Sequence, residues 1–149
     1  MGRITERLVN TSRVAIDTSL FIYHFEAHPV YLSMTREIFS GIERGNWLGI
    51  TSTVTLMELN VRPIQLGRLD IARQHEALLV NFPNLSIYDI DRDIARIAAR
   101  LRADFRVRPP DALQAATALA AHADIFITND QQLHRLKALI DVLILDECI

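Results

Sequence analysis

Four carboxylates stand at places in this sequence where they could act on one metal ion. They are Asp17, Glu58, Asp111 and Asp130. Asp17 directly follows the apolar run of residues 14–16, and Asp130 lies just past the apolar run of residues 125–127. If those runs are parallel strands, both acids lie at the sheet edge where α/β proteins bind ligands. Carboxylates gathered there would repel one another unless a cation lay between them, and oxygen ligands favour Mg²⁺ or Mn²⁺.

Such a site suits the hydrolysis of phosphate esters. A divalent ion lowers the pKa of a bound water and stabilises the attacked and leaving oxygens, so no protein nucleophile is needed. Thr128 and Ser19 lie near two of the acids and could orient a carboxylate or a water by hydrogen bonding. Each of these residues also has a structural interpretation, because hydroxyl and carboxylate side chains commonly cap helices.

The elements that would position these residues alternate along the chain. Short apolar segments predict strands at residues 14–16, 47–50, 85–88, 124–128 and 141–145. Helical patterns follow them from residue 18, at 29–45, from 51 until Pro63 interrupts the helix, and at 70–82, 91–105, 111–123 and 130–139. This alternation predicts an α/β fold, a three-layer α/β/α sandwich around a five-stranded parallel sheet.

Composition places the chain among ordinary globular proteins. Its 149 residues suit a single domain, 1–149, in which residues 1–12 could form a loose N-terminal extension. No apolar run is long enough to cross a bilayer and no secretory segment begins the chain, so we expect a cytoplasmic protein without membrane contact. The single cysteine excludes an internal disulfide.

Positive charge is local rather than general. The formal net charge is −2, yet six of the fifteen arginines fall within residues 92–108. They could hold an RNA backbone near the carboxylates, or they could form a solvated helix face. Arg108, the closest to Asp111, is the candidate substrate-binding residue. His24 and His28 are four residues apart but lack a third ligand of suitable type nearby, so we do not expect a zinc site.

Three runs carry a resemblance to a known family: VAIDTSLFIYHFE, TSTVTLMELN and RPPDALQAATALAAHADIFITND. In this order and spacing they resemble the PIN-domain family, especially its short ribonuclease toxins of the VapC type. The resemblance covers about residues 13–145 and implies a five-stranded parallel sheet with a Mg²⁺- or Mn²⁺-dependent nuclease site. By motif position the family's acidic residues and supporting hydroxyl correspond to Asp17, Glu58, Asp111, Asp130 and Thr128.

We therefore expect a metal-dependent endoribonuclease that hydrolyses RNA phosphodiesters. The resemblance further implies the toxin of a toxin–antitoxin pair, inhibited by a small antitoxin protein and forming a homodimer. Two alternatives stay open: a catalytically inactive PIN-like module that binds RNA or protein, and a hydrolase of a small phosphate ester.

Overall fold

The computed structural model describes residues 3–149, and a sheet of five parallel strands forms its centre. The strands are β1 (Arg13–Ile16), β2 (Leu48–Ser52), β3 (Leu85–Tyr88), β4 (Ile125–Thr128) and β5 (Asp141–Ile144). Their order in the sheet is β3-β2-β1-β4-β5, and all four neighbouring pairs are parallel. The predicted strands and sheet are therefore confirmed.

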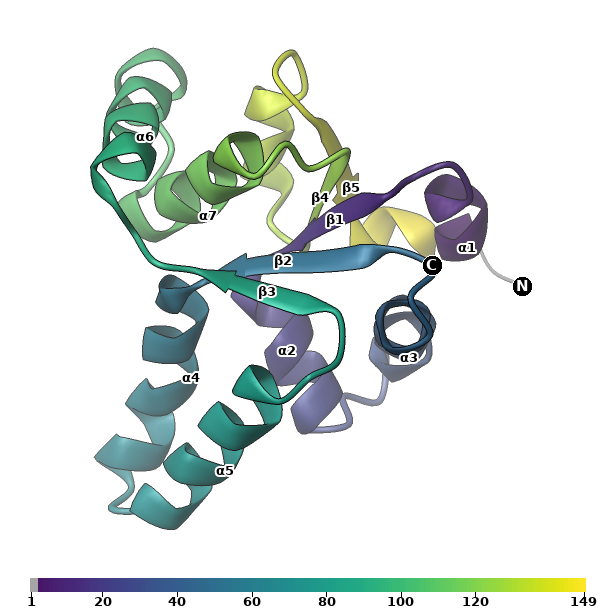
Figure 1. Ribbon diagram of the computed structural model, residues 1–149, viewed down its shortest axis with the longest axis vertical. Coiled ribbons are helices and arrows are strands. Elements are labelled where there is room, and N and C mark those ends of the chain that lie inside the picture. Colours follow the sequence, from purple (N-terminus) through teal and green to yellow (C-terminus); the bar gives the residue numbers. More distant parts are fainter. Residues whose placement is uncertain (1–2) are drawn as a thin grey trace.

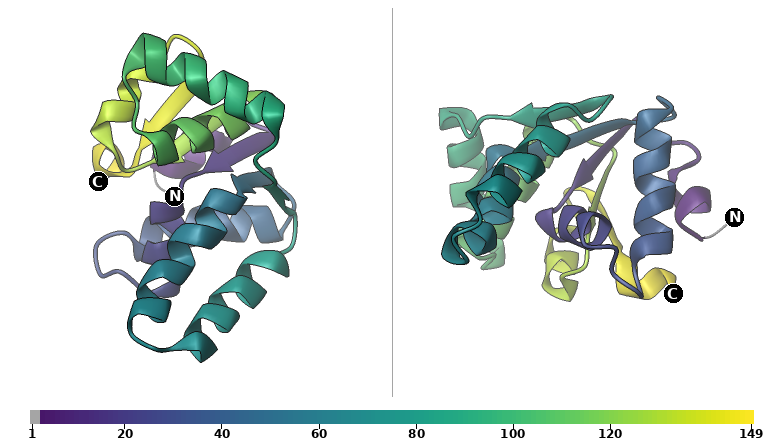
Figure 2. Two further views of the ribbon diagram at one scale, coloured as in Figure 1. Left: turned by 90° about the vertical axis from the view of Figure 1, so that its left-hand side faces the viewer. Right: turned by 90° about the horizontal axis from the view of Figure 1, so that it is seen from below.

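Helices cover both faces of the sheet (Figure 1). They are α1 (Arg3–Leu8), α2 (Thr18–Phe25), α3 (Leu32–Glu43), α4 (Thr53–Gln65), α5 (Leu69–Val80), α6 (Arg92–Phe105) and α7 (Pro109–Ala120), with the 3₁₀ helices η1 (Gln131–Leu136) and η2 (Leu145–Cys148). One core lies between the sheet and α1 to α5, and a second lies between the sheet and α6, α7 and η1. The three-layer architecture is thus confirmed. In Figures 1 and 2, α4 and α5 form a hairpin that extends beyond the sheet.

Burial on both faces explains the continuous apolar runs of the central strands. In β1, Val14 and Ile16 belong to the first core and Ala15 to the second. In β4, Ile125 belongs to the first core and Phe126 to the second. Because successive side chains of a strand point to opposite faces, a strand covered on both sides must be apolar at every position.

The strand order reverses beside β1. From β1 the chain proceeds to β2 and β3 on one side, and then crosses to β4 and β5 on the other. The carboxyl ends of β1 and β4 therefore flank the point where an open α/β sheet forms its ligand crevice.

Two helices differ from the prediction. α4 continues through the buried Pro63 to Gln65, because a proline in the last turn removes only one backbone hydrogen bond and the remaining helix is short. The segment expected to be helical over 130–139 is a 3₁₀ helix that ends at Leu136.

The predicted loose extension at residues 1–12 contains α1, whose Ile4 and Leu8 are buried in the first core. Residues 1–2 lie outside the described part. No helix among residues 3–149 is long and apolar enough to cross a membrane.

Candidate active site

Asp17 lies at the carboxyl end of β1 and caps the N-terminus of α2. Its Oδ1 accepts a hydrogen bond from the Thr18 backbone N–H at 2.9 Å, and its Oδ2 accepts one from the Thr128 hydroxyl at 2.7 Å. The Thr128 oxygen in turn accepts a hydrogen bond from the Asp130 N–H at 3.2 Å. Thr128 therefore joins the ends of β1 and β4 through hydrogen bonds with Asp17 and Asp130, and its supporting role in the site stays a prediction.

The surroundings of Asp17 disfavour its negative charge. Only 8% of the residue is exposed, and burial raises the pKa of its carboxyl from 3.8 to about 6. The hydrogen bond from Thr128 lowers this pKa, whereas the charges of Asp111 and Glu58 raise it. Two of the other predicted acids thus oppose the ionisation of Asp17, and a cation beside it would relieve this repulsion.

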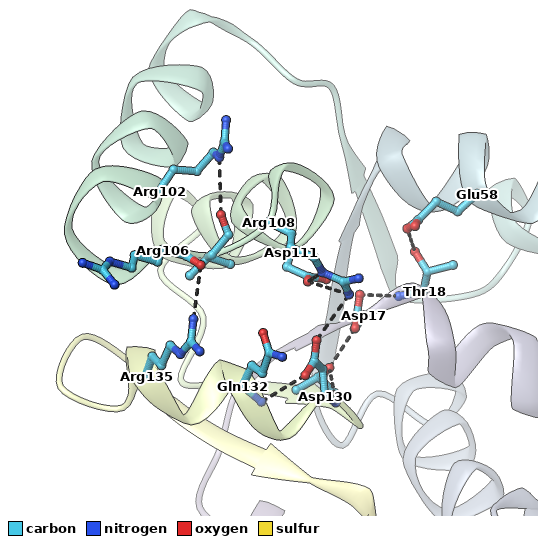
Figure 3. Close-up of polar contacts among 12 residues, drawn as sticks. Asp17, Thr18, Glu58, Arg102, Arg106, Arg108, Asp111, Asp130, Gln132 and Arg135 are labelled. Carbon is cyan, nitrogen blue, oxygen red and sulfur yellow. Dashed lines mark hydrogen bonds and ion pairs between the residues drawn. The ribbon is translucent and has the colours of Figure 1, made fainter.

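Asp111 and Asp130 face a common guanidinium. The Arg108 Nη2 lies 3.2 Å from Asp111 Oδ2 and 3.5 Å from Asp130 Oδ2 (Figure 3). Burial raises the pKa of Asp111, Arg108 lowers it, and the charge of Asp130 raises it. The Arg108 side chain is 71% exposed while that of Asp111 is 14% exposed, so the arginine approaches the carboxylates from the solvent side.

Two prolines fix the position of Arg108. Pro109 and Pro110 occupy the first turn of α7, and Arg108 precedes the helix with φ −66° and ψ 153°. A residue before proline is held in the extended region because its backbone clashes with the proline ring in the helical region. The same start places Asp111 in the first turn of α7, as predicted.

Glu58 reaches the rim from α4. Its Oε1 accepts a hydrogen bond from the Thr18 hydroxyl at 2.6 Å. Thr18 follows Asp17 directly and its backbone N–H donates to the Asp17 carboxylate, so this one residue connects two predicted site residues.

Gln114 is a further residue that the sequence reasoning missed. It is 3% exposed, and its Nε2 donates hydrogen bonds to Thr18 Oγ1 at 3.0 Å and to Thr55 Oγ1 at 2.8 Å. Its Oε1 accepts one from the Ser52 hydroxyl at 2.8 Å. One buried amide thereby joins α7, α2 and the start of α4, the helices that carry or follow three of the acids. The only signal in the sequence was a glutamine in an alanine-rich helix, one turn after Asp111.

Ser19 contrasts with Thr128. Its Oγ is buried and makes no hydrogen bond within residues 3–149. No hydrogen bond from this hydroxyl to a carboxylate is present among these residues, so its supporting role stays a prediction.

The donor set suits a hard divalent ion, but the ligand geometry is not assembled. Within residues 3–149, no three His, Cys, Asp or Glu side chains are placed to hold one ion together. Arg108 contacts Asp111 and Asp130, whereas threonine hydroxyls donate hydrogen bonds to Asp17 and Glu58. The chemistry nevertheless fits an ion, because the donors are all oxygen and the charge of neighbouring acids opposes ionisation of Asp17 and Asp111.

Comparisons with known proteins agree with this fold. The sequence model of the family described as PIN domain matches residues 14–139. A comparison with curated proteins finds no match. Similar solved structures include VapBC2 from Rickettsia felis bound to a promoter DNA fragment, with a TM-score of 0.67 and 18% identity over 88% of this chain and 97% of that one.

Two structures from Mycobacterium tuberculosis are also similar. VapBC-5, of a family of toxin–antitoxin systems, has a TM-score of 0.56 and 26% identity over 89% of this chain and 97% of that one. VapC20, described as a Sarcin-Ricin loop cleaving toxin, has a TM-score of 0.60 and 16% identity over 76% of this chain and 86% of that one.

Proposed function

This chain belongs to the PIN domain family, and from that membership and the carboxylate rim we propose that it is a Mg²⁺- or Mn²⁺-dependent endoribonuclease of the VapC type. The observation that carries the proposal is the buried Asp17 at the switch point of the sheet, oriented by Thr128 and repelled by Asp111 and Glu58. The description of VapC20 as a toxin that cleaves the Sarcin-Ricin loop supports RNA as the substrate.

Each residue of the rim has a proposed part in the reaction. The ligands of the ion would be Asp17, Glu58, Asp111 and Asp130. When bound, the ion supplies a water of lowered pKa and stabilises charge on the phosphate oxygens. Thr128 holds Asp17 in one orientation through its hydroxyl. Arg108 neutralises Asp111 and Asp130 in the structure described here, and its exposed guanidinium would contact the RNA phosphate once those acids bind an ion.

Cleavage of structured RNAs tests the proposal. The purified protein should cut RNA with Mg²⁺ or Mn²⁺ and lose this activity in EDTA. Asp111→Asn should abolish cleavage, whereas Asp104→Asn, which changes an exposed carboxylate of α6, should not. Cleavage that persists in EDTA or in Asp111→Asn would contradict the proposal.

Other results would assign a different activity. RNA binding that is equal with and without chelator, and without cleavage, would indicate an inactive binding module. Hydrolysis of a nitrophenyl phosphate but of no RNA would indicate a hydrolase of small phosphate esters.

The proposed biological role is that of a cytoplasmic toxin inhibited by an antitoxin protein. The similar structure VapBC-5 is described as a member of a family of toxin–antitoxin systems, which supports this role. The chain offers a groove of about 650 Å³ between α2, α4 and α5, lined by apolar residues such as Phe25, Leu59 and Ile71 and reaching Glu58 at the rim. A partner helix seated there would lie against an acidic residue of the site.

Co-purification tests the antitoxin. A small protein encoded by the reading frame immediately upstream should co-purify with the wild type and suppress cleavage. Ile71→Glu, in the groove, should weaken its capture, while Leu139→Glu, on an exposed site outside the groove, should not. Equal capture by both variants would place the partner elsewhere.

The proposed homodimer rests on exposed apolar surface. Of the exposed large apolar side chains among residues 3–149, seven of eleven lie on α4, α5 and their connection. Met57, Val61 and Ile64 form a stripe along α4 outside the groove. Light scattering should give twice the chain mass for the wild type and the monomer mass for Val61→Glu; a monomeric wild type would contradict the dimer.

A further inference from the structure

Three arginines lie at the loop between α6 and α7, beside the carboxylate rim: two donate hydrogen bonds to its carbonyls, and the side chain of the third extends outward from it (Figure 3). They are Arg102, Arg106 and Arg135. The Arg102 Nε donates to the Val107 carbonyl at 3.3 Å, and the Arg135 Nη1 donates to the Arg106 carbonyl at 3.2 Å. Figure 3 shows these side chains on the side of Arg108 that faces away from Asp17. We call these three residues the arginine edge.

The charge of the arginine edge is not neutralised by the protein. Within residues 3–149, none of its three guanidinium groups forms an ion pair, whereas Arg108 contacts two carboxylates. The backbone carbonyls that position Arg102 and Arg135 carry no net charge, and each guanidinium keeps further N–H donors for a ligand. All three residues are exposed. In a chain of formal net charge −2, this is a local concentration of positive charge.

The backbone of Arg106 determines how its charge can be tested. Arg106 ends α6 in the left-handed region, with φ 57° and ψ 39°, and its N–H donates to the Arg102 carbonyl at 3.1 Å. Glycine is usual at such helix ends, because a Cβ atom makes this conformation unfavourable by about 1 kcal/mol. Ala27 and His122 adopt the same conformation just after α2 and α7, so the conformation alone assigns no function, but it makes glycine a compatible substitute at position 106.

We propose that the arginine edge binds the phosphate backbone of the RNA strand where it leaves the carboxylate rim. This inference rests on the proposed ribonuclease function. Guanidinium groups recognise phosphate oxygens through paired N–H donors, and uncompensated positive charge attracts a polyanion. Because the contacts would be to phosphates, the edge would position RNA without reading its sequence.

Arg106→Gly isolates the charge from the fold. Glycine suits the left-handed backbone, so this variant should unfold at the same temperature as the wild type or higher. Binding is measured by fluorescence anisotropy with labelled single-stranded oligouridine, in an Asp111→Asn background that prevents cleavage. Affinity should fall by up to about fivefold, as for an exposed ion pair. The slope of log affinity against log salt should become shallower by about 0.7.

Two matched variants distinguish the effect of the arginine edge from the effect of positive charge elsewhere on the protein. Arg106→Lys keeps the charge and should retain most of the salt slope. Arg73→Gln removes an exposed arginine of α5, remote from the loop, and should leave both affinity and slope unchanged. If Arg106→Gly binds oligouridine as the wild type does, or if Arg73→Gln weakens binding equally, the proposal is overturned.

The remaining outcomes keep this proposal distinct from the ribonuclease assignment. Metal-dependent cleavage by the wild type, together with unchanged binding by Arg106→Gly, would remove the arginine edge alone. Absence of oligouridine binding at every salt concentration would remove the edge, and absence of cleavage of any RNA would remove the ribonuclease. If Arg106→Gly lost capture of the antitoxin but kept its affinity for oligouridine, the arginine edge would be a protein-binding surface instead.

Discussion

Asp17→Asn should stabilise the metal-free protein at pH 8 although it abolishes cleavage. In the folded protein the pKa of Asp17 is about 6, against 3.8 ordinarily, because the carboxyl is buried. A raised pKa means that this residue favours folding most at low pH, where it is protonated, and that this contribution is lost as pH rises through 6. Asparagine is neutral at every pH, so its contribution to the free energy of unfolding does not fall as the pH rises.

The size of the effect follows from the shift. About two pKa units correspond to about 3 kcal/mol at pH 8, since each unit is worth 1.36 kcal/mol. Replacing the carboxylate also weakens the hydrogen bond from Thr128, at a cost of about 1 kcal/mol. The net gain in the free energy of unfolding should be about 2 kcal/mol at pH 8, a rise in Tm of about 4–8 °C. By pH 4.5 the gain should fall to about zero.

Thermal and urea unfolding in EDTA at both pH values measure this gain. The difference between the two pH values is the informative quantity, because a constant hydrogen-bond loss cancels from it. Asp104→Asn, at an exposed position of α6, provides the matched control and should show little change at either pH. An Asp17→Asn protein that is destabilised equally at pH 4.5 and pH 8 would refute the reasoning.

Three further predictions concern the ion, the buried amide and the core. Mg²⁺ should raise the Tm of the wild type at pH 7.5 and raise that of Asp111→Asn less, because binding to the folded state stabilises it; an equal rise in both would contradict the ligand role. Gln114→Leu should lower the free energy of unfolding by about 2–3 kcal/mol, since its three buried hydrogen bonds are lost, and should reduce kcat through the displaced helices. Unchanged urea unfolding would contradict this. Gly41→Ala should destabilise by about 1–3 kcal/mol despite the better helix propensity of alanine, because the added Cβ would overlap the Trp47 ring; an unchanged Tm would contradict this packing argument.

The sequence was sufficient for the fold because the strands are buried on both faces. Apolar runs such as residues 14–16 and 125–127 cannot be surface strands, and the helical segments between them require parallel pairing. The continuation of α4 through Pro63 was missed for a physical reason: a proline near the end of a helix removes a hydrogen bond that tertiary packing can replace.

The site was predictable only in part. Asp17 and Asp111 could be placed because each lies at a fixed point beside a strand or helix start. The pairing of Arg108 with Asp130 spans 22 residues and depends on how the ends of α7 and β4 meet, which no local pattern describes. The same holds for Gln114, whose partners lie up to 96 positions away in the chain.

The two prolines that start α7 have a consequence for recognition. Pro109 and Pro110 leave the backbone next to Arg108 little freedom, and Arg102 and Arg135 hold the preceding carbonyls from both sides. An incoming ligand therefore meets a template whose shape is already set, and little conformational entropy is lost on contact. The loop between α6 and α7 should therefore select among ligands by their shape. Binding there should be fast and should not be followed by a slow conformational change of the protein.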